Sequence, residues 1–267
     1  MIETGGDRWL ADATYRHPNG LLTRLLRPDC IDYRGTSIRR VTRDGITFDL
    51  DLSDYVQWTI CFGIEHDEKS ILFDLAKPGQ VVLDVGTNVG EVLLNFAKRV
   101  GPQGRVIGFE PNPDTMAKCR HNLSLNCFDN VALHEVALGD VADKAFLGHP
   151  SKTNAGADRI GSSGIPVDVR TLDGLTANFS RLDLIKIDVE GFDLKVLRGG
   201  SQTLERFRPT LFVELNDSNL REQRDSPAAL VRWLESQRYA VRDAVTQKPV
   251  KSTDNLDGCG CDIIAQA

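Results

Sequence analysis

The fold is decided by one stretch, Val81-Val82-Leu83-Asp84-Val85-Gly86-Thr87-Asn88-Val89-Gly90. Its branched apolar start is typical of a strand that is buried on both faces of a parallel sheet. Residues 91–99 follow with apolar side chains at helical spacing. The pattern therefore predicts a strand, a glycine turn and a helix, with Gly86 and Gly90 allowing the backbone to pass close to a ligand. In open parallel sheets, ligands bind in the crevice beyond the carboxyl end of such a strand.

The residues of the turn narrow the choice of ligand. A dinucleotide fingerprint that starts at Gly86 would need glycine at Asn88 and at Glu91. A carboxylate at Glu91 is unfavourable where a pyrophosphate would sit on the helix N-terminus, and no phosphate-binding lysine follows the turn. Asp84 before the turn favours a ligand that carries positive charge and no phosphate. S-adenosylmethionine (SAM), with its ammonium and sulfonium groups, fits this pattern.

Composition sets limits on the class of protein. A chain of 267 residues with 41% hydrophobic residues can hold one large domain with extensions or two small ones. The net charge of −6 argues against general nucleic-acid binding. No long apolar run predicts a membrane-spanning helix, and the N-terminus lacks the apolar core of a signal peptide. The six scattered cysteines contain no C-x-x-C pair and are expected to be reduced thiols. We expect a cytoplasmic protein that does not insert into a membrane.

Downstream of the turn, strands and helices alternate, which predicts an α/β fold with a mostly parallel sheet. We expect strands at 105–110, 131–138, 182–188 and 209–215. We expect helices at 113–126, 193–207 and 227–237. A closing antiparallel pair of strands is expected at 239–245 and 261–267. We expect an N-terminal cap of helix and hairpin over residues 1–60, with a short helix at 21–26 and a strand at 46–52. The main domain is expected over 61–267, beginning with a helix at 67–76 and interrupted by an insertion at 140–181 that adds a strand at 165–172.

Glu110 is the first candidate site residue. It ends the second strand, about 20 residues beyond the turn, where dinucleotide folds place the acid that binds ribose hydroxyls. Pro111 and Asn112 would shape the same wall. The alternative is a solvated acid at a strand end.

A second group of polar residues ends the fourth strand. The period of two places Lys186 and Asp188 on one face, with Glu190 just beyond. These residues predict a reaction site; the alternative is that Asp188 or Glu190 caps the next helix. Glu214 ends the fifth strand and would face the same edge, unless it is only a solvated loop acid. Mg²⁺ held by Asp188, Glu190 and Glu214 remains an alternative that we do not favour.

The segment before the turn holds weaker candidates. Glu65 and His66 could fold over the cofactor, and His66 has a ring suited to act as a base near neutral pH. Tyr55 and Trp58 could form a wall of a substrate pocket. For His66, a structural or exposed position is the favoured alternative, and core packing explains Tyr55 and Trp58 at least as well.

Four motifs in order, 82–90, 106–113, 137–140 and 184–191, resemble the FkbM-type family of SAM-dependent methyltransferases, and the last motif, Leu-Ile-Lys-Ile-Asp-Val-Glu-Gly, is the most distinctive. The resemblance covers about residues 60–215. It implies a class I methyltransferase sheet of seven strands with a reversed last hairpin, and O-methylation of a hydroxyl.

The resemblance also implies roles for particular residues. Asp84, Gly86, Asn88 and Gly90 would line the methionine end of SAM, and Glu110 would bind the ribose. At the end of the third strand, two apolar residues would border the adenine, Ala137 and Leu138. In the insertion, a short Asn-x-Gly element of the family is matched by Asn154 and Gly156.

From these observations we predict transfer of the SAM methyl group to a hydroxyl of a sugar, glycan or natural-product acceptor. Asp188 is the first candidate for the general base, helped by Glu190 and Glu214, while Lys186 orients a carboxylate or stabilises charge on the acceptor oxygen. The alternatives are an NAD-dependent oxidoreductase and a SAM-fold partner subunit that does not catalyse. The identity of the acceptor and the formation of a homo-oligomer stay open.

Overall fold

The structure is a computed structural model that describes residues 11–15, 20–21, 25, 27–33, 37–64, 66–148, 158–161 and 163–267, with the backbone alone for 66–68. Its strands are β1 (Ile38–Arg43), β2 (Ile46–Asp51), β3 (Val81–Val85), β4 (Arg105–Phe109), β5 (Val131–His134), β6 (Ala137–Leu138), β7 (Asp143–Gly148), β8 (Arg159–Gly161), β9 (Ile165–Arg170), β10 (Leu184–Ile187), β11 (Thr210–Asn216), β12 (Ala240–Asp243) and β13 (Gly260–Gln266). Its helices are the short 3₁₀ helix η1 (Cys30–Asp32) and α3 (Tyr55–Phe62), α4 (His66–Leu75), α5 (Glu91–Val100), α6 (Pro113–Ser124), α7 (Leu172–Thr176), α8 (Asp193–Arg198), α9 (Ser201–Phe207), α10 (Asp217–Glu222) and α11 (Pro227–Ser236).

The main sheet has seven strands in the order β12-β13-β11-β10-β3-β4-β5. Strands β11, β10, β3, β4 and β5 run parallel, and β13 is antiparallel to both of its neighbours. The predicted α/β class and the reversed closing hairpin are therefore confirmed. The deciding stretch lies in the middle of this sheet, where β3 pairs with β10 on one side and β4 on the other.

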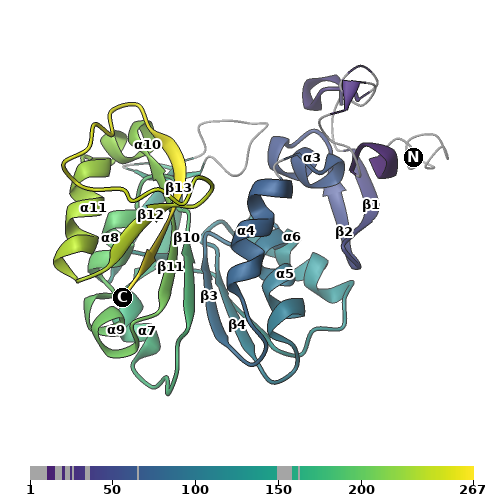
Figure 1. Ribbon diagram of the computed structural model, residues 1–267. Helices are drawn as coiled ribbons and strands as arrows, with labels where there is room; N and C mark the ends of the chain where they lie inside the picture. Colours follow the sequence, from purple (N-terminus) through teal and green to yellow (C-terminus); the bar gives the residue numbers. More distant parts are fainter. Residues whose placement is uncertain are drawn as a thin grey trace.

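Helices cover both faces of the main sheet (Figure 1). Alternate residues of β3 serve the two faces, because side chains along a strand point to opposite sides. Leu83 and Val85 join a buried cluster with α8, α9 and α11, whereas Val82 joins a second cluster with α4, α5 and α6. Burial on both faces explains the unbroken apolar run at the start of β3.

The third predicted strand is divided between two sheets. The expectation of one strand over 131–138 is wrong, because β5 ends at His134 and the chain then leaves the main sheet. Ala137 and Leu138 form β6 and pair with Val169 and Arg170 of β9 instead. With β7 and β8, these strands make a separate four-stranded sheet in the order β6-β9-β7-β8. The insertion thus contributes a small sheet rather than a single added strand.

The predicted helix at 193–207 is likewise two helices, α8 and α9, separated by Gly199 and Gly200. A side chain at Gly199 would place its Cβ 2.0 Å from the carbonyl oxygen of Gly139. This contact requires glycine, and glycine weakens a helix interior. The helix ends where the chain passes Gly139, at the entry to the insertion.

The N-terminal hairpin of β1 and β2 packs beside the glycine turn. Phe48 and Leu50 of β2 form a buried cluster with Trp58 of α3, with Val89 of the glycine turn and with Leu94 of α5. Full burial of an apolar side chain of this size stabilises a fold by about 1.5–3 kcal/mol. The cluster holds α3 next to the turn. The predicted helix at 21–26 lies largely outside the described residues.

The outer edge of β2 is bonded to side chains rather than to another strand. The backbone N–H of Thr47 donates to Asn126 Oδ1 at 2.9 Å, and the backbone N–H of Asp49 donates to Asn122 Oδ1 at 2.9 Å. The next outward N–H, that of Asp51, donates to Gln57 Oε1 at 2.9 Å. Asn122 also donates through Nδ2 to the carbonyl of Val89, at 3.0 Å. These amides fix the hairpin to α6, α3 and the glycine turn.

No helix within the described part of the chain is long and apolar enough to cross a membrane.

Candidate functional site

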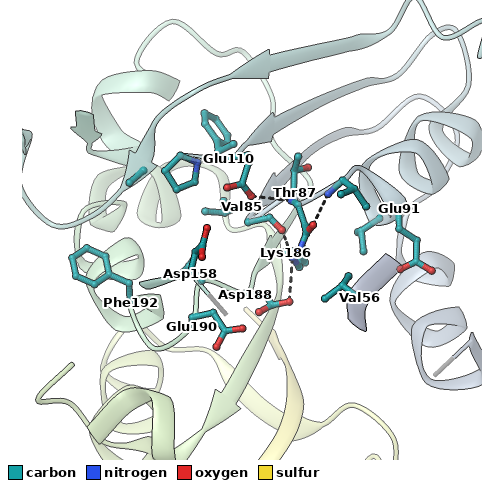
Figure 2. Close-up of a pocket in the computed structure, with 18 of the residues that line it drawn as sticks. Val56, Val85, Thr87, Glu91, Glu110, Asp158, Lys186, Asp188, Glu190 and Phe192 are labelled. Carbon is teal, nitrogen blue, oxygen red and sulfur yellow. Dashed lines mark hydrogen bonds and ion pairs between the residues drawn. The ribbon is translucent and has the colours of Figure 1, made fainter. Parts of the chain in front are cut away.

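A cavity opens at the carboxyl ends of β3, β4 and β10. The turns after these strands form its floor, and α3 and α4 contribute one wall. Another wall comes from β6 together with β7 and β8 of the insertion. Figure 2 shows Glu110, Asp158, Lys186, Asp188 and Glu190 around this cavity. The strand ends of the main sheet therefore bring the two predicted groups of site residues together, since the carboxyl ends of parallel strands meet at one edge.

The glycine turn lies between the ends of the two neighbouring strands, β4 and β10. The backbone N–H groups of Gly86 and Thr87 both donate to the carbonyl of Phe109, each at 3.0 Å. Gly86 has a φ of +81°, and a Cβ there would lie 1.9 Å from the carbonyl oxygen of Asp188. Glycine is therefore required by conformation and by space. Gly86 and Asn88 line the cavity, whereas Gly90 lies behind them at the start of α5.

Asp84 is completely buried and serves the turn rather than the cavity surface. Its Oδ2 accepts a hydrogen bond from Thr87 Oγ1 at 2.5 Å, and its Oδ1 lies 3.5 Å from Lys186 Nζ. Burial raises the pKa of Asp84 against the opposing effect of Lys186. The structure thus places this predicted cofactor residue beneath the turn, in contact with Thr87 and Lys186.

Glu110 stands at the end of β4 with its carboxylate fixed by backbone groups. Its Oε2 accepts from the N–H of Asn88 at 3.0 Å, and its Oε1 accepts from the N–H of Asn112 at 2.9 Å. The residue is only 8% exposed, and burial raises its pKa to about 7. Pro111 and the short strand β6 continue the same wall, so the predicted residues at the second and third strand ends do meet.

Asp158, from the insertion, also reaches this wall and was missed from the sequence. It accepts a hydrogen bond from Asn112 Nδ2 at 2.5 Å and lines the cavity. Its charge contributes to the raised pKa of Glu110, after burial. Nothing in the spacing of residues around 158 signals this position, because it depends on the fold of the insertion. Asn154 and Gly156 lie outside the described residues.

Lys186 links the two strand ends. Its Nζ donates to the carbonyl of Gly86 at 2.7 Å and lies 3.4 Å from Asp188 Oδ2 and 3.5 Å from Asp84 Oδ1. Burial opposes its charge, but the two carboxylates outweigh burial and raise the pKa of Lys186. Of the three predicted residues on this turn, Asp188 has the most exposed side chain, at 46%, and it faces the cavity. The predicted shared face of Lys186 and Asp188 is present.

Glu190 lies at the rim of the same cavity in a left-handed backbone conformation, with a φ of +55°. Its Oε2 accepts from Asn219 Nδ2 at 2.8 Å and lies 3.7 Å from Arg159 of β8. Burial, followed by the charge of Asp188, raises the pKa of Glu190 to about 7, while Arg159 opposes the shift. Arg159 also pairs with Glu222, so it ties the insertion to α10.

Glu214 is near this group, but it is not one of the described residues that line the cavity. Its Oε2 lies 3.5 Å from Asn219 Nδ2. Burial, and then the charges of Asp188 and Asp193, raise its pKa to about 9. Among the residues that the structure describes, no cluster of His, Cys, Asp or Glu is arranged to hold a metal ion.

The amide groups of the turn after β10 are satisfied by Asp193, which is 1% exposed. It accepts from the N–H of Val189 at 3.3 Å and from that of Gly191 at 3.0 Å. The alternative in which Asp188 or Glu190 caps the helix therefore has no hydrogen bond to support it among the described contacts. The sequence did signal this position, because Asp193 is an acid in the first turn of α8.

The opposite wall comes from α3, α4 and the start of α5. Tyr55 and Thr59 of α3 line the cavity, and an ion pair between Lys69 and Glu91 lines it further along. Trp58 points elsewhere, since its indole N–H donates to the carbonyl of Pro28 at 3.0 Å. The side chain of His66 and all of Glu65 lie outside the described residues.

Part of this chain is similar in sequence to known methyltransferases. A family model described as the methyltransferase FkbM domain matches residues 84–241. The chain is 31% identical over 176 residues to the 2-O-methyltransferase NoeI of Sinorhizobium fredii, which covers 58% of this chain and 70% of the relative. It is 27% identical over 145 residues to the hexuronic acid methyltransferase AglP of Haloferax volcanii, across 53% of this chain and 58% of that protein.

Among solved structures, the methyltransferase FkbM from Methylobacillus flagellatus is 15% identical and aligns with a TM-score of 0.46 over 79% of this chain and 55% of that one. The family match spans more than half of the sequence and includes the glycine turn, Glu110 and the strand end at Lys186 to Gly191. This chain therefore belongs to the FkbM family of methyltransferases.

Proposed function

We propose that this protein transfers a methyl group from SAM to a hydroxyl of a sugar or of a sugar-containing acceptor. Membership of a methyltransferase family supports the reaction class. The cavity at the strand ends is the place where this fold class binds its ligands. The observation that carries the proposal is Glu110, a buried carboxylate held by two backbone N–H groups at the edge of that cavity.

Glu110 has the chemistry of a ribose-binding acid. A carboxylate offers about four lone-pair positions, and the two backbone N–H groups occupy one position on each oxygen. The remaining positions can accept hydrogen bonds from two neighbouring hydroxyls of a ribose. Pro111 and the apolar residues Val136, Ala137 and Leu138 would then border the adenine.

The charges around the cavity suit SAM as the methyl donor. Among the described lining residues, carboxyl groups outnumber amines, with Glu91, Glu110, Asp158, Asp188 and Glu190 against Lys69 and Lys186. An acidic lining attracts a ligand of net positive charge, such as SAM. It disfavours the pyrophosphate of a dinucleotide, which argues against the NAD-dependent oxidoreductase.

The chemistry requires a group that takes the hydroxyl proton. SAM, when bound, supplies an activated methyl group on its sulfonium sulfur. We assign the proton acceptor to Asp188, whose carboxylate faces the cavity and is ion-paired with Lys186. The reaction would break the O–H bond of the acceptor and the S–CH₃ bond of the donor and form an O–CH₃ bond; the proton would pass to Asp188, and S-adenosylhomocysteine would leave. Lys186 acts as a positioning residue, since it holds Asp188 and the carbonyl of Gly86 together.

The carboxylate of Glu190 is the second candidate for the base. Its pKa of about 7 would match a reaction near neutral pH, where a general base works best. Both Asn219 and Arg159 contact its Oε2, and the residue lines the cavity. Glu214 lies near both residues, but its pKa of about 9 leaves it mainly protonated near neutral pH, so it carries little charge there.

The proposed class of acceptor is inferred from the names of two relatives. One is named as a 2-O-methyltransferase and another as a hexuronic acid methyltransferase, which supports a sugar as the acceptor of this chain. Tyr55 and Thr59 are well placed to contact it, because α3 forms the wall opposite the insertion. An aromatic ring that is 42% exposed at a cavity offers a flat apolar surface to a sugar face.

The proposal is tested by incubating the protein with methyl-labelled SAM and a panel of hexoses, deoxyhexoses and hexuronic acids. We expect label to appear in an acceptor that gains the mass of one methylene unit. Asp188→Asn should keep SAM affinity within about 3-fold and lower turnover by about 10²–10⁴-fold, the usual contribution of a general base. Glu190→Gln is the matched comparison that decides between the two acids.

Two results would count against this function. Unchanged turnover in Asp188→Asn would remove its role as the base. SAM binding without transfer to any acceptor of the panel would favour a partner subunit that does not catalyse.

A further inference from the structure

An ion pair lines the cavity on the side away from Glu110. Lys69 extends from α4, Glu91 begins α5, and Lys69 Nζ lies 2.7 Å from Glu91 Oε2. Both side chains are largely but not fully covered, at 22% and 18% exposed, and both line the cavity. Figure 2 shows Glu91 and Glu110 on opposite sides of the glycine turn.

Other contacts also join the two helices that carry this pair. Asp74 of α4 and Arg99 of α5 already form another ion pair, at 2.6 Å, and exposed pairs of this kind stabilise proteins by only about 0–1 kcal/mol. Leu72 and Phe73 of α4 are also buried in the same apolar cluster as the inner face of α5. The position of Lys69 and Glu91 in the cavity therefore calls for a role beyond helix packing.

We propose that Lys69 and Glu91 bind the amino-acid end of the methyl donor, with Lys69 contacting its α-carboxylate and Glu91 its α-ammonium. This inference rests on SAM being the donor. The α-carbon of SAM carries both groups, so the ligand presents opposite charges side by side. A lysine and a glutamate that lie in contact present the complementary arrangement, and hydrogen bonds between charged groups are the strong ones.

Lys69 is better suited to this role than the other lysine of the cavity. Lys186 is held by the carbonyl of Gly86 and stands between two acids, with a side chain that is only 6% exposed. Lys69 has more exposed surface, and its partner Glu91 follows the glycine turn directly. A ligand with its ribose at Glu110 would cross that turn to reach the pair.

The test compares three ligands by isothermal titration. SAM carries both charged groups, decarboxylated SAM lacks the carboxylate, and 5′-methylthioadenosine lacks the whole amino-acid end. Lys69→Met should weaken SAM binding by about 10- to 100-fold, the effect of losing a hydrogen bond between charged groups. The same variant should change binding of decarboxylated SAM and of methylthioadenosine by less than about 3-fold on the same reasoning.

Glu91→Gln probes the ammonium in the same way. It should weaken both SAM and decarboxylated SAM, and leave methylthioadenosine binding unchanged. The double variant Lys69→Glu/Glu91→Lys keeps an ion pair between the helices but reverses its poles. It should retain the melting temperature of the parent protein and lose SAM affinity. Asp74→Asn, which breaks the other pair between α4 and α5, is the control and should bind SAM normally.

The outcomes separate this inference from the proposed function. If the parent protein binds no SAM, the proposed donor is wrong and the inference is wrong with it. If the parent binds SAM but Lys69→Met weakens SAM and methylthioadenosine equally, or the double variant binds SAM normally, only the inference is overturned. The pair would then be a contact between two helices.

Discussion

Replacing Lys186 by methionine should destabilise the protein strongly, because it leaves a buried carboxylate without its cation. Asp84 is 0% exposed, and Lys186 is 5% exposed. Removing one partner of a buried pair costs about 3–5 kcal/mol. The contact with Asp188 adds little to this figure, since that side chain is 46% exposed and screened by water. At about 2–4 °C per kcal/mol for chains of this size, the melting temperature should fall by about 6–20 °C.

The loss of stability should depend on pH. Burial raises the pKa of Asp84 even with Lys186 present, so its pKa must rise further once the lysine is removed. An acid whose pKa is higher in the folded state stabilises that state below its unfolded pKa, and this stability is lost as pH rises through the folded pKa. The difference in unfolding free energy between the parent and Lys186→Met should therefore be large at pH 8 and should become smaller toward pH 5. In the parent, the raised pKa of Lys186 gives stability that is lost only in strongly alkaline solution.

Thermal unfolding followed by circular dichroism, at pH 5 and pH 8, measures this effect. The double variant Lys186→Met/Asp84→Asn removes both charges and should recover a large part of the lost stability at pH 8. A loss below about 1 kcal/mol would show that the buried pair contributes no more than an exposed one. An equal loss at both pH values, with no recovery in the double variant, would refute the reasoning from the buried charge.

Three further predictions concern the glycine turn, Glu110 and Glu190. Gly86→Ala should abolish SAM binding, whereas Gly101→Ala, which shares a positive φ but has open space around its Cβ, should not; titration calorimetry with both variants decides. SAM affinity should fall as pH drops below about 7, because protonated Glu110 loses acceptor capacity, and Glu110→Gln should show a flatter pH dependence. Arg159→Met should raise the pKa of Glu190, because Arg159 lowers it in the parent. If Glu190 acts as the base, the acid limb of the plot of turnover against pH should move to higher pH. An unmoved limb would contradict this role.

The sequence predicts the centre of the fold well because its signals are local. The apolar run of β3, the glycine turn and the acid at the end of β4 each follow from a few neighbouring residues. Gly86 is glycine because of the carbonyl of Asp188, about 100 residues away, yet the turn can be recognised without that knowledge. The strand ends then meet because the sheet is parallel.

What the sequence does not predict depends on contacts between distant segments. Ala137 and Leu138 continue an apolar pattern, and only their pairing with β9 shows that they leave the main sheet. Glu214 does lie close enough to Asp188 for the two charges to interact, but it does not line the cavity. Asp158 and Lys69 reach the cavity from an insertion and from a preceding helix, and no motif marks either position.

The side-chain amides along β2 have a consequence for how copies of this protein can associate. An exposed strand edge is a template to which a strand of another molecule can add. Here Asn126, Asn122 and Gln57 occupy the outward N–H groups of three alternate residues of β2. They close that edge to strand addition while leaving the hairpin only two strands wide. These three positions are therefore restricted to amides, since replacing any of them by an apolar side chain would expose a strand edge that can associate, next to the cavity.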